Sequence, residues 1–137
     1  MTVRPNEGMP CDPDLLEPLG RVNWAAARLH HVLRDRIGTL DGALSDDPFD
    51  GTLGSTVRSL DAKANAQGRA DIEQWCQGVG MAAVEARNGV AHAIAFTAKD
   101  GKQALRGSTP SRPARYLVDD LLDVADQLIE AARALPS

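Results

Sequence analysis

The chain has 137 residues, about the length of one domain, and its 43% hydrophobic and 25% charged residues are typical of a globular protein rather than a disordered one. Its formal charge of −4 excludes a general attraction to nucleic acid, although a local basic patch remains possible. No apolar run approaches the ~20 residues that cross a bilayer, no secretory signal is recognised, and two cysteines are too few for a disulfide framework. We therefore expect a cytoplasmic protein with no membrane partner.

The first part of the chain is predicted to hold an arm and a helix. Residues 1–17 are predicted to form a flexible N-terminal arm, because prolines and glycines interrupt them without periodicity, and a single domain then spans 18–137. A helix is predicted from Pro18, because proline suits a first turn, and Gly38 is expected to cap its end. Its buried stripe, at steps of three and four, consists of Leu19, Val22, Ala26, Leu29, Leu33 and Ile37.

The middle of the chain is predicted to hold a loop and two helices. Glycines and a proline among aspartates indicate a loop over 41–54. A short helix follows and ends at Gly68. A third helix is predicted over 70–95, in which Gly78 and Gly80 would let another helix approach closely. The apolar sides of the two helices consist of Leu53, Val57, Leu60 and Ala64, and of Ile72, Trp75, Val79, Ala83, Ala86 and Val90.

The last third of the chain is predicted to hold a β-hairpin and a final helix. Asp100-Gly101 suits a two-residue type I′ turn, and the final helix is expected to start near Ser111 or Pro113. Its buried face consists of Val118, Leu121, Leu122, Ala125, Leu128, Ile129, Ala132 and Leu135. The sequence thus predicts an all-α fold, a four-helix, mostly antiparallel bundle with a short β-hairpin before the last helix. Trp24 and Trp75 are both expected in its core.

Histidine and cysteine are the side chains most able to carry chemistry near neutral pH. His30 and His31 are adjacent on the first helix, about 100° apart, and are interpreted as surface or boundary residues. Cys76 is interpreted as a small buried hydrophobe. No histidine has a second His or Cys four residues away, so neither a metal site nor a cofactor is predicted.

The remaining histidine, His92, follows Arg87 and Asn88 at the end of the third predicted helix. Asn88 and His92 are four residues apart and share a face. Arg87 points about 140° away from His92, so a long side chain, a loosened turn at Gly89 or a two-fold partner is needed to unite them. Histidine can transfer protons, and arginine can stabilise charge on a phosphate. Arg87, Asn88 and His92 are therefore candidate catalytic residues for RNA cleavage by in-line 2′-OH attack.

The same segment resembles the motif of the HEPN (higher eukaryotes and prokaryotes nucleotide-binding) superfamily, an arginine, a polar residue after it and a histidine beyond a gap of four to six residues. The stretches PLGRV and TLGSTV are also similar to that superfamily. The resemblance implies a small helical domain that forms a homodimer, with the two motifs facing one cleft. It further implies either a metal-independent endoribonuclease of toxin–antitoxin or other defence systems, with RNA as substrate and an antitoxin as partner, or a non-catalytic module that binds a protein or nucleotide.

Charge along the last third of the chain supplies further candidates. Residues 101–118 contain four basic side chains and no acid, and Tyr116 among them is a candidate for stacking on a base. The predicted RNA-binding residues are Lys102, Arg106, Arg112, Arg115 and Tyr116, with a solvated loop as the alternative. The final helix carries an acidic face of Asp119, Asp123, Asp126 and Glu130, which is interpreted as solvated. A plain structural bundle, in which Arg87 pairs with a carboxylate, remains a third interpretation.

Overall fold

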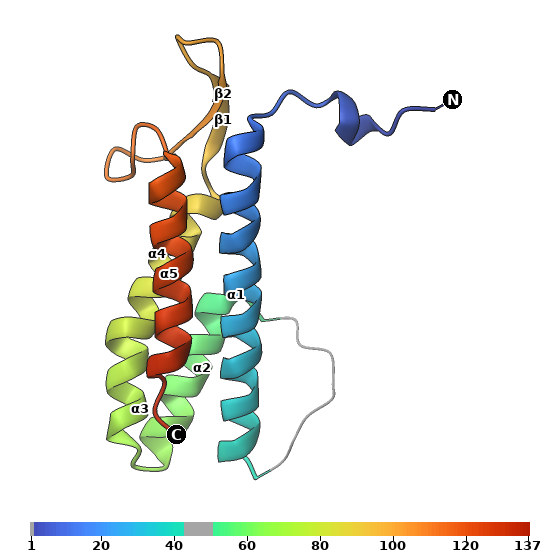
Figure 1. Ribbon diagram of the computed structural model, residues 1–137. Coiled ribbons are helices and arrows are strands. Elements are labelled where there is room, and N and C mark those ends of the chain that lie inside the picture. Colours follow the sequence, from blue (N-terminus) through green and yellow to red (C-terminus); the bar gives the residue numbers. More distant parts are fainter. Residues whose placement is uncertain (1, 43–50) are drawn as a thin grey trace.

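The computed structural model describes residues 2–42 and 51–137 as a bundle of helices with a hairpin at one end (Figure 1). Most of the loop predicted over 41–54 lies outside the described residues. Within those residues, no helix is both long and apolar enough to cross a membrane. The elements are a short 3-10 turn Pro5–Gly8, helices α1 (Pro13–Leu40), α2 (Leu53–Ala66) and α3 (Ala70–Trp75), a π-helical turn Cys76–Gly80, helix α4 (Met81–Ala91), strands β1 (Ile94–Thr97) and β2 (Gln103–Arg106), and helix α5 (Val118–Ala134).

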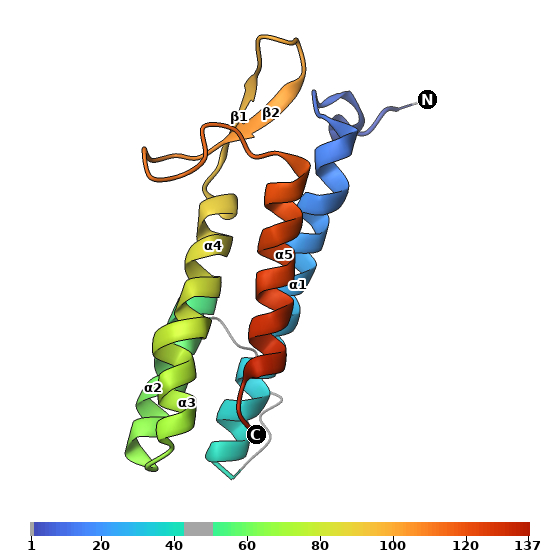
Figure 2. The ribbon, with the colours of Figure 1, turned by 60° about the vertical axis from the view of Figure 1, so that its left-hand side comes forward.

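Helices α1, α2 and α5 run in one direction, and α3 and α4 run back alongside them (Figures 1 and 2). The contacts agree with this arrangement, because Thr56 meets His30 near the start of α2, and Gln67 reaches the Leu40 carbonyl where both helices end. The predicted four-helix bundle with a hairpin before its last helix is confirmed. The packed pairs α1–α2 and α1–α5 are parallel, however, because the long connection after α1 does not force its neighbour to be antiparallel.

Aliphatic side chains from all the helices fill the core. Each fully buried Leu or Ile contributes about 1.5–3 kcal/mol to the stability of the fold. Trp75 is buried as predicted, and its indole Nε1 donates a hydrogen bond of 3.0 Å to the Ala131 carbonyl. Trp24 is 69% exposed, so its predicted burial is wrong. The largest fully buried side chains are those of Leu29, Leu33, Leu60, Ile72, Leu121 and Leu128.

α1 begins at Pro13 rather than at Pro18. The Asp12 carboxylate accepts a hydrogen bond of 2.9 Å from the backbone N–H of Asp14, which caps the helix, and Pro13 takes the first position. Pro18 lies one turn inside the helix and is buried. The arm predicted over residues 1–17 therefore overlaps the first turn of α1 and also includes the 3-10 turn.

Of the two glycines predicted to end a helix, Gly38 and Gly68, only Gly68 does so. α1 continues past Gly38, which is buried within it, to Leu40, and Gly42 with a φ of 72° forms the turn that follows. Gly38 is thus not the predicted cap. Gly68 does close the turn after α2, with a φ of 69°, as predicted.

The third predicted helix is one helical run broken by the π-helical turn, and it ends at Ala91 rather than at residue 95. The π turn inserts an extra residue, which turns the following side chains around the helix axis. Val79 is therefore 48% exposed, and Val84 is buried in its place. A Cβ on Gly80 would lie 2.6 Å from the Trp75 ring, whereas one on Gly78 would meet open space. Gly80 thus makes room for Trp75, and not for another helix.

The hairpin pairs β1 with β2 in antiparallel register, with Ile94 opposite Arg106. Its turn differs from the predicted type I′ turn. The N–H of Gly101 donates to the Ala98 carbonyl at 2.9 Å, and the N–H of Ala98 donates to Lys102 at 2.8 Å. Gly101 has a φ of 83°, and no other described residue of the turn has a positive φ. This geometry is a type I turn followed by a glycine bulge, because Asp100 keeps an ordinary backbone conformation.

α5 begins at Val118, several residues later than predicted. The chain before it is held as a loop, because the N–H of Gly107 donates to the Pro113 carbonyl at 2.7 Å, and the N–H of Tyr116 donates to Leu105 of β2 at 2.8 Å. Most of the predicted apolar face is buried or half-buried. Val118 and Ile129 are instead 37% and 40% exposed.

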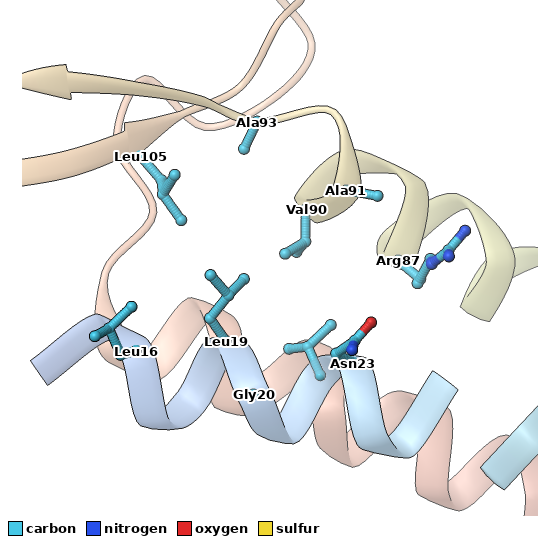
Figure 3. Close-up of a pocket in the computed structure, with 10 residues that line it drawn as sticks. Leu16, Leu19, Gly20, Asn23, Arg87, Val90, Ala91, Ala93 and Leu105 are labelled. Carbon is cyan, nitrogen blue, oxygen red and sulfur yellow. The ribbon is translucent and has the colours of Figure 1, made fainter. Parts of the chain in front are cut away.

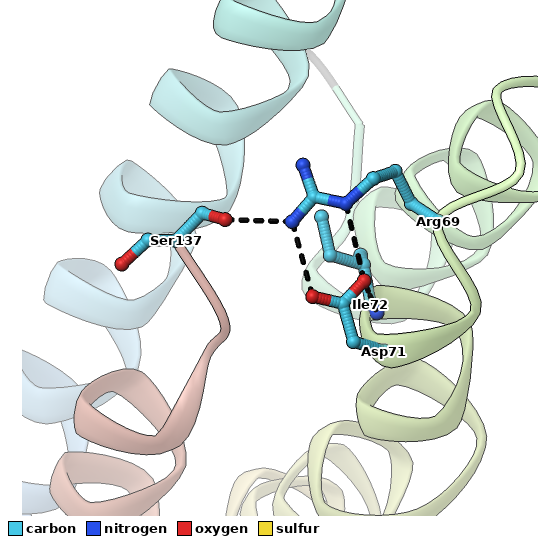
Figure 4. Close-up of polar contacts among 4 residues, drawn as sticks. All are labelled: Arg69, Asp71, Ile72 and Ser137. Atoms are coloured by element: carbon cyan, nitrogen blue, oxygen red, sulfur yellow. Dashed lines mark hydrogen bonds and ion pairs between the residues drawn. The ribbon is translucent and has the colours of Figure 1, made fainter.

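The end of the bundle away from the hairpin is held by Arg69, in the turn between α2 and α3 (Figure 4). Its guanidinium donates to both carboxylate oxygens of Asp71 at 3.1 Å and to the backbone oxygen of Ser137 at 2.6 Å. The hydrogen bond from Arg69 lowers the pKa of the Asp71 carboxyl. These contacts connect the residues after α5 to the start of α3.

Candidate active site

The candidate motif lies at the C-terminal end of α4. Arg87 and Asn88 belong to the last turns of the helix, and His92 follows as its cap, with its backbone N–H donating to the Asn88 carbonyl at 3.0 Å. The side chains of Arg87 and Asn88 are half-buried, and that of His92 is exposed. Among the described residues, His92 has no side-chain polar partner. Its imidazole is therefore open to solvent and to other molecules.

Arg87 lines a pocket of about 520 Å³ between α1, α4 and β2 (Figure 3). Arg87 and Asn23 of α1 form the polar end of this α1–α4 pocket, and apolar residues line the rest. The Arg87 Nη1 donates a hydrogen bond of 3.3 Å to the Asn88 side-chain oxygen. This hydrogen bond holds the guanidinium beside the Asn88 side chain. The apolar lining consists of Leu16, Leu19, Val22, Val90, Ala91, Ala93 and Leu105.

Arg87 and His92 do not meet within one chain. Arg87 faces the α1–α4 pocket, whereas His92 is absent from its lining. Glu85, Gly89 and His92 follow one another at steps of four and three, so they share a different side of α4. The predicted angular separation of Arg87 and His92 therefore persists, and the turn at Gly89 does not loosen the helix enough to close it.

Gly89 serves a packing role inside the motif. A Cβ there would lie 2.5 Å from the Arg112 Nη1 and 2.8 Å from the Tyr116 hydroxyl. Arg112 uses this space to donate a hydrogen bond of 2.9 Å to the Glu85 carbonyl, and it also approaches the Glu85 carboxylate at 3.3 Å. Gly89 therefore lets the loop before α5 pack closely against α4.

The predicted RNA-binding residues divide into two groups. Arg112 is bound to Glu85, and Arg115 donates to the Asp100 carboxylate at 3.2 Å. Lys102 and Arg106 on the hairpin are exposed and have no side-chain polar partner among the described residues.

The position of Tyr116 contradicts the prediction that this residue stacks on a base. Its side chain is 4% exposed and belongs to the core, so it cannot stack on a base. Burial also raises the pKa of the Tyr116 phenol. Sequence proximity to basic residues suggested RNA contact, but the short bridge to Leu105 turns the ring inward.

His30, which was predicted only as a surface or boundary residue, lies close enough to Arg87 to be affected by its charge. It is half-buried on α1, and its Nε2 lies 3.0 Å from the hydroxyl of Thr56 on α2. Burial lowers the pKa of His30, and the positive charges of Arg87 and Arg34 lower it further. Arg87 of α4 therefore acts electrostatically on His30 of α1 within one chain. No sequence spacing joins residues from α1 and α4, so only the fold reveals this relation.

The other candidate groups have structural explanations. His31 approaches the Asp35 carboxylate at 3.2 Å on the exposed side of α1. Cys76 is buried as predicted, and burial raises the pKa of its thiol to about 12, so it is not a thiolate at neutral pH. Within residues 2–42 and 51–137, no three side chains of His, Cys, Asp or Glu are grouped to hold a metal ion.

Comparison with family models, with curated proteins and with solved structures finds no match to this chain.

Proposed function

We propose that this protein is a metal-independent endoribonuclease of the HEPN type, acting in the cytoplasm as a toxin or another defence effector. The observation that carries the proposal is the position of Arg87, which lines an open pocket and whose guanidinium donates a hydrogen bond to Asn88. An arginine in this position offers a fork of donors to a phosphate from solvent. The exposed imidazole of His92 supplies a group that can donate or accept a proton.

The proposed reaction is an in-line transesterification. The 2′-oxygen of a ribose attacks the adjacent phosphorus and loses its proton to a base, while the bond from phosphorus to the 5′-oxygen breaks. The leaving 5′-oxygen takes a proton from an acid, so the products are a 2′,3′-cyclic phosphate and a 5′-hydroxyl. His92 is assigned to one of the proton transfers, and Arg87 to the charge that develops on the phosphate oxygens.

The proposal requires two chains, because Arg87 and His92 lie on different sides of α4. A homodimer would bring His92 of one copy to Arg87 of the other. Such a dimer needs an interface, and the exposed face of α1 and α5 is the best candidate. There Trp24 stands at the edge of a groove of about 670 Å³ whose floor is formed by Val32, Leu122, Ala125, Ile129 and Ala132.

The charges around this groove suit a second copy of the same chain. Arg21 and Arg28 of α1 line it, with Arg21 in an ion pair of 2.8 Å with Glu17, whereas the outer face of α5 carries four exposed carboxylates, of which Asp126 lines the groove. None of these carboxylates forms an ion pair within the described residues. A two-fold partner would set the basic edge of one α1 against the acidic face of the other α5, in both directions at once. An exposed tryptophan is also the residue type that most often anchors an interface.

We expect Trp24→Ala to convert the dimer to a monomer, because it removes the largest exposed apolar side chain of the groove. The measurement is light scattering coupled to size exclusion, at protein concentrations around the dissociation constant. Val79→Ala is the matched control, since Val79 is also exposed but lies on the π turn, away from the groove. A wild-type protein that stays monomeric at about 100 μM would rule out this interface.

The function itself is tested by incubating end-labelled RNA with the purified protein in EDTA. We expect the wild-type protein to leave cyclic phosphate ends, and His92→Ala to abolish cleavage while keeping the helical content, because an exposed side chain contributes little to stability. His31→Ala serves as the matched control, since His31 is an exposed histidine of α1. Cleavage that persists in His92→Ala, or that needs an added metal, would contradict the proposal.

A non-catalytic module is the second candidate, and the exposed Trp24 groove is the observation that favours it. In that case the wild-type protein stays dimeric or binds a protein or nucleotide partner, and it cleaves no RNA. This alternative would be supported if the dimer depends on Trp24 and the wild-type protein cleaves neither structured nor unstructured RNA.

A further inference from the structure

The α1–α4 pocket has the features of a small-molecule site. Its volume of about 520 Å³ is typical of ligand pockets, which are mostly apolar and contain a few polar groups. Figure 3 shows the side chains of Leu19, Val90 and Leu105 pointing into one space between α1, α4 and β2. Leu16, which also lines the pocket, is 46% exposed. A ligand with an apolar body would therefore remove apolar surface from water.

The apolar surface continues from this pocket toward the chain that precedes α1. Three leucines line both the pocket and a second hollow of about 160 Å³, which Met9 and Pro10 also line. These leucines are Leu16, Leu19 and Leu105. Asn23, at the polar end of the pocket, stands seven residues after Leu16, which is about 10 Å along the axis of α1. The space therefore suits an extended chain better than a compact ring system.

The lining favours an aliphatic ligand over a nucleobase. Among the described residues that line the pocket, none is aromatic, and only Arg87 and Asn23 have polar side chains. A nucleobase is recognised by stacking on planar side chains and by hydrogen bonds along its edges, and the leucines and valines of the pocket supply neither. An alkyl chain needs only the apolar contact that these side chains provide.

The polar end of the pocket carries one positive charge. Arg87 is the only charged residue among the described residues of the lining, and it forms no ion pair with any described residue. Its hydrogen bond of 3.3 Å goes to the neutral Asn88, so other N–H donors of the guanidinium remain for a ligand. A carboxylate carries one negative charge and accepts two parallel hydrogen bonds from a guanidinium, whereas a phosphate monoester carries about −1.5 to −2. A single arginine therefore matches a carboxylate.

We propose that the α1–α4 pocket binds an aliphatic carboxylate. Arg87 and the Asn23 amide hold its carboxylate, and its chain lies along Leu19 and Leu16 toward the second hollow. Binding itself does not depend on the proposed function. Its consequence rests on that function, because a carboxylate on Arg87 occupies the donors assigned to the RNA phosphate. The ligand is thus an inhibitor of RNA cleavage that competes with the substrate.

The test is a titration of the isotope-labelled full chain with octanoate, followed by the NMR signals of the backbone amides. We expect the largest changes at Leu16, Leu19 and Val90. Hexanoate should bind about ten-fold more weakly, because each buried CH₂ group changes the affinity about three- to four-fold. Octylammonium has the same chain and the opposite charge, so it should bind at least about ten-fold more weakly than octanoate.

Four variants separate the head group from the chain. Arg87→Gln should weaken octanoate binding about ten-fold or more and leave octanol binding unchanged, which a misfolded protein would not do. Arg58→Gln is the matched control, an exposed arginine of α2, and should change neither affinity. Leu16→Asn should weaken octanoate and octanol alike, because it makes the wall polar. Trp24→Ala should change neither, because Trp24 lines the other apolar groove.

The proposal would be overturned if octanoate shifts the amides around Trp24 and not those of the pocket, or if octylammonium binds as tightly as octanoate. Octanoate binding in the pocket of a protein that cleaves no RNA would contradict the proposed function and support the carboxylate site. Cleavage that continues at an unchanged rate when octanoate saturates the pocket would overturn the inhibitory role.

Discussion

Replacing Arg87 with alanine is expected to reduce RNA cleavage by about 100-fold or more, the loss that follows when a donor to transition-state charge is removed. The variant should fold normally, because the side chain is half-buried at the edge of a pocket and its hydrogen bond within the described residues goes to the neighbouring Asn88. Arg87→Lys should recover little, since an ammonium group lacks the two-pronged geometry of a guanidinium. The measurement is the single-turnover rate on end-labelled RNA, beside the helical content from circular dichroism.

Mixing Arg87→Ala with His92→Ala tests whether two chains build the site. If Arg87 of one copy acts with His92 of the other, each mixed dimer contains one intact site. Random exchange makes half of the dimers mixed, so activity should return to about a quarter of the wild-type value. A site within one chain predicts no recovery, because neither chain is intact. The assignment of the site to two chains would be refuted if activity returned in a mixture that contains no dimers. It would also be refuted if Arg87→Ala alone were fully active.

Gly80→Ala is expected to cost the fold about 1–3 kcal/mol, the usual effect of overfilling a packed core. The new methyl group would lie 2.6–2.9 Å from three atoms of the Trp75 ring. That ring cannot retreat easily, because it is buried and its N–H is bonded to the Ala131 carbonyl. Urea denaturation followed by circular dichroism measures the change in the free energy of unfolding.

Gly78→Ala is the matched control for this prediction. It lies in the same π-helical turn, but a Cβ there meets nothing within 4 Å. Alanine should therefore stabilise the protein by up to about 1 kcal/mol through its better helix propensity. Equal effects of the two substitutions would show that packing on Trp75 does not determine the role of Gly80.

The helices and their apolar stripes could be predicted because periodic burial depends on local sequence. The stripe of α1 from Val22 to Leu33 is buried as predicted, and Gly68 closes the turn after α2. Helix directions could not be predicted, because the connection between α1 and α2 is long enough to permit either. The exposure of Trp24 could not be predicted either, because it also depends on how the helices are arranged. It lies at the edge of the stripe, where burial depends on which neighbours pack there.

The candidate site was predictable only where its residues are neighbours in sequence. Arg87, Asn88 and His92 fall on one helix end, and the angle between Arg87 and His92 follows from helix geometry. The relation of His30 to Arg87 joins residues 57 positions apart through the packing of three helices, so no local pattern indicates it. The inward orientation of Tyr116 likewise depends on a long-range bridge to Leu105.

The π-helical turn determines the direction in which the side chains of α4 point around the helix axis, relative to those of α3. Removing one residue from Cys76–Gly80 would restore a regular α-helix and rotate the downstream helix by about 100° relative to α3. Val84 would then leave the core, and Arg87 would turn away from α1. A one-residue deletion in this short turn is therefore far more disruptive than a conservative substitution at its exposed positions. Chains related to this one should preserve the length of the segment even where they change its residues.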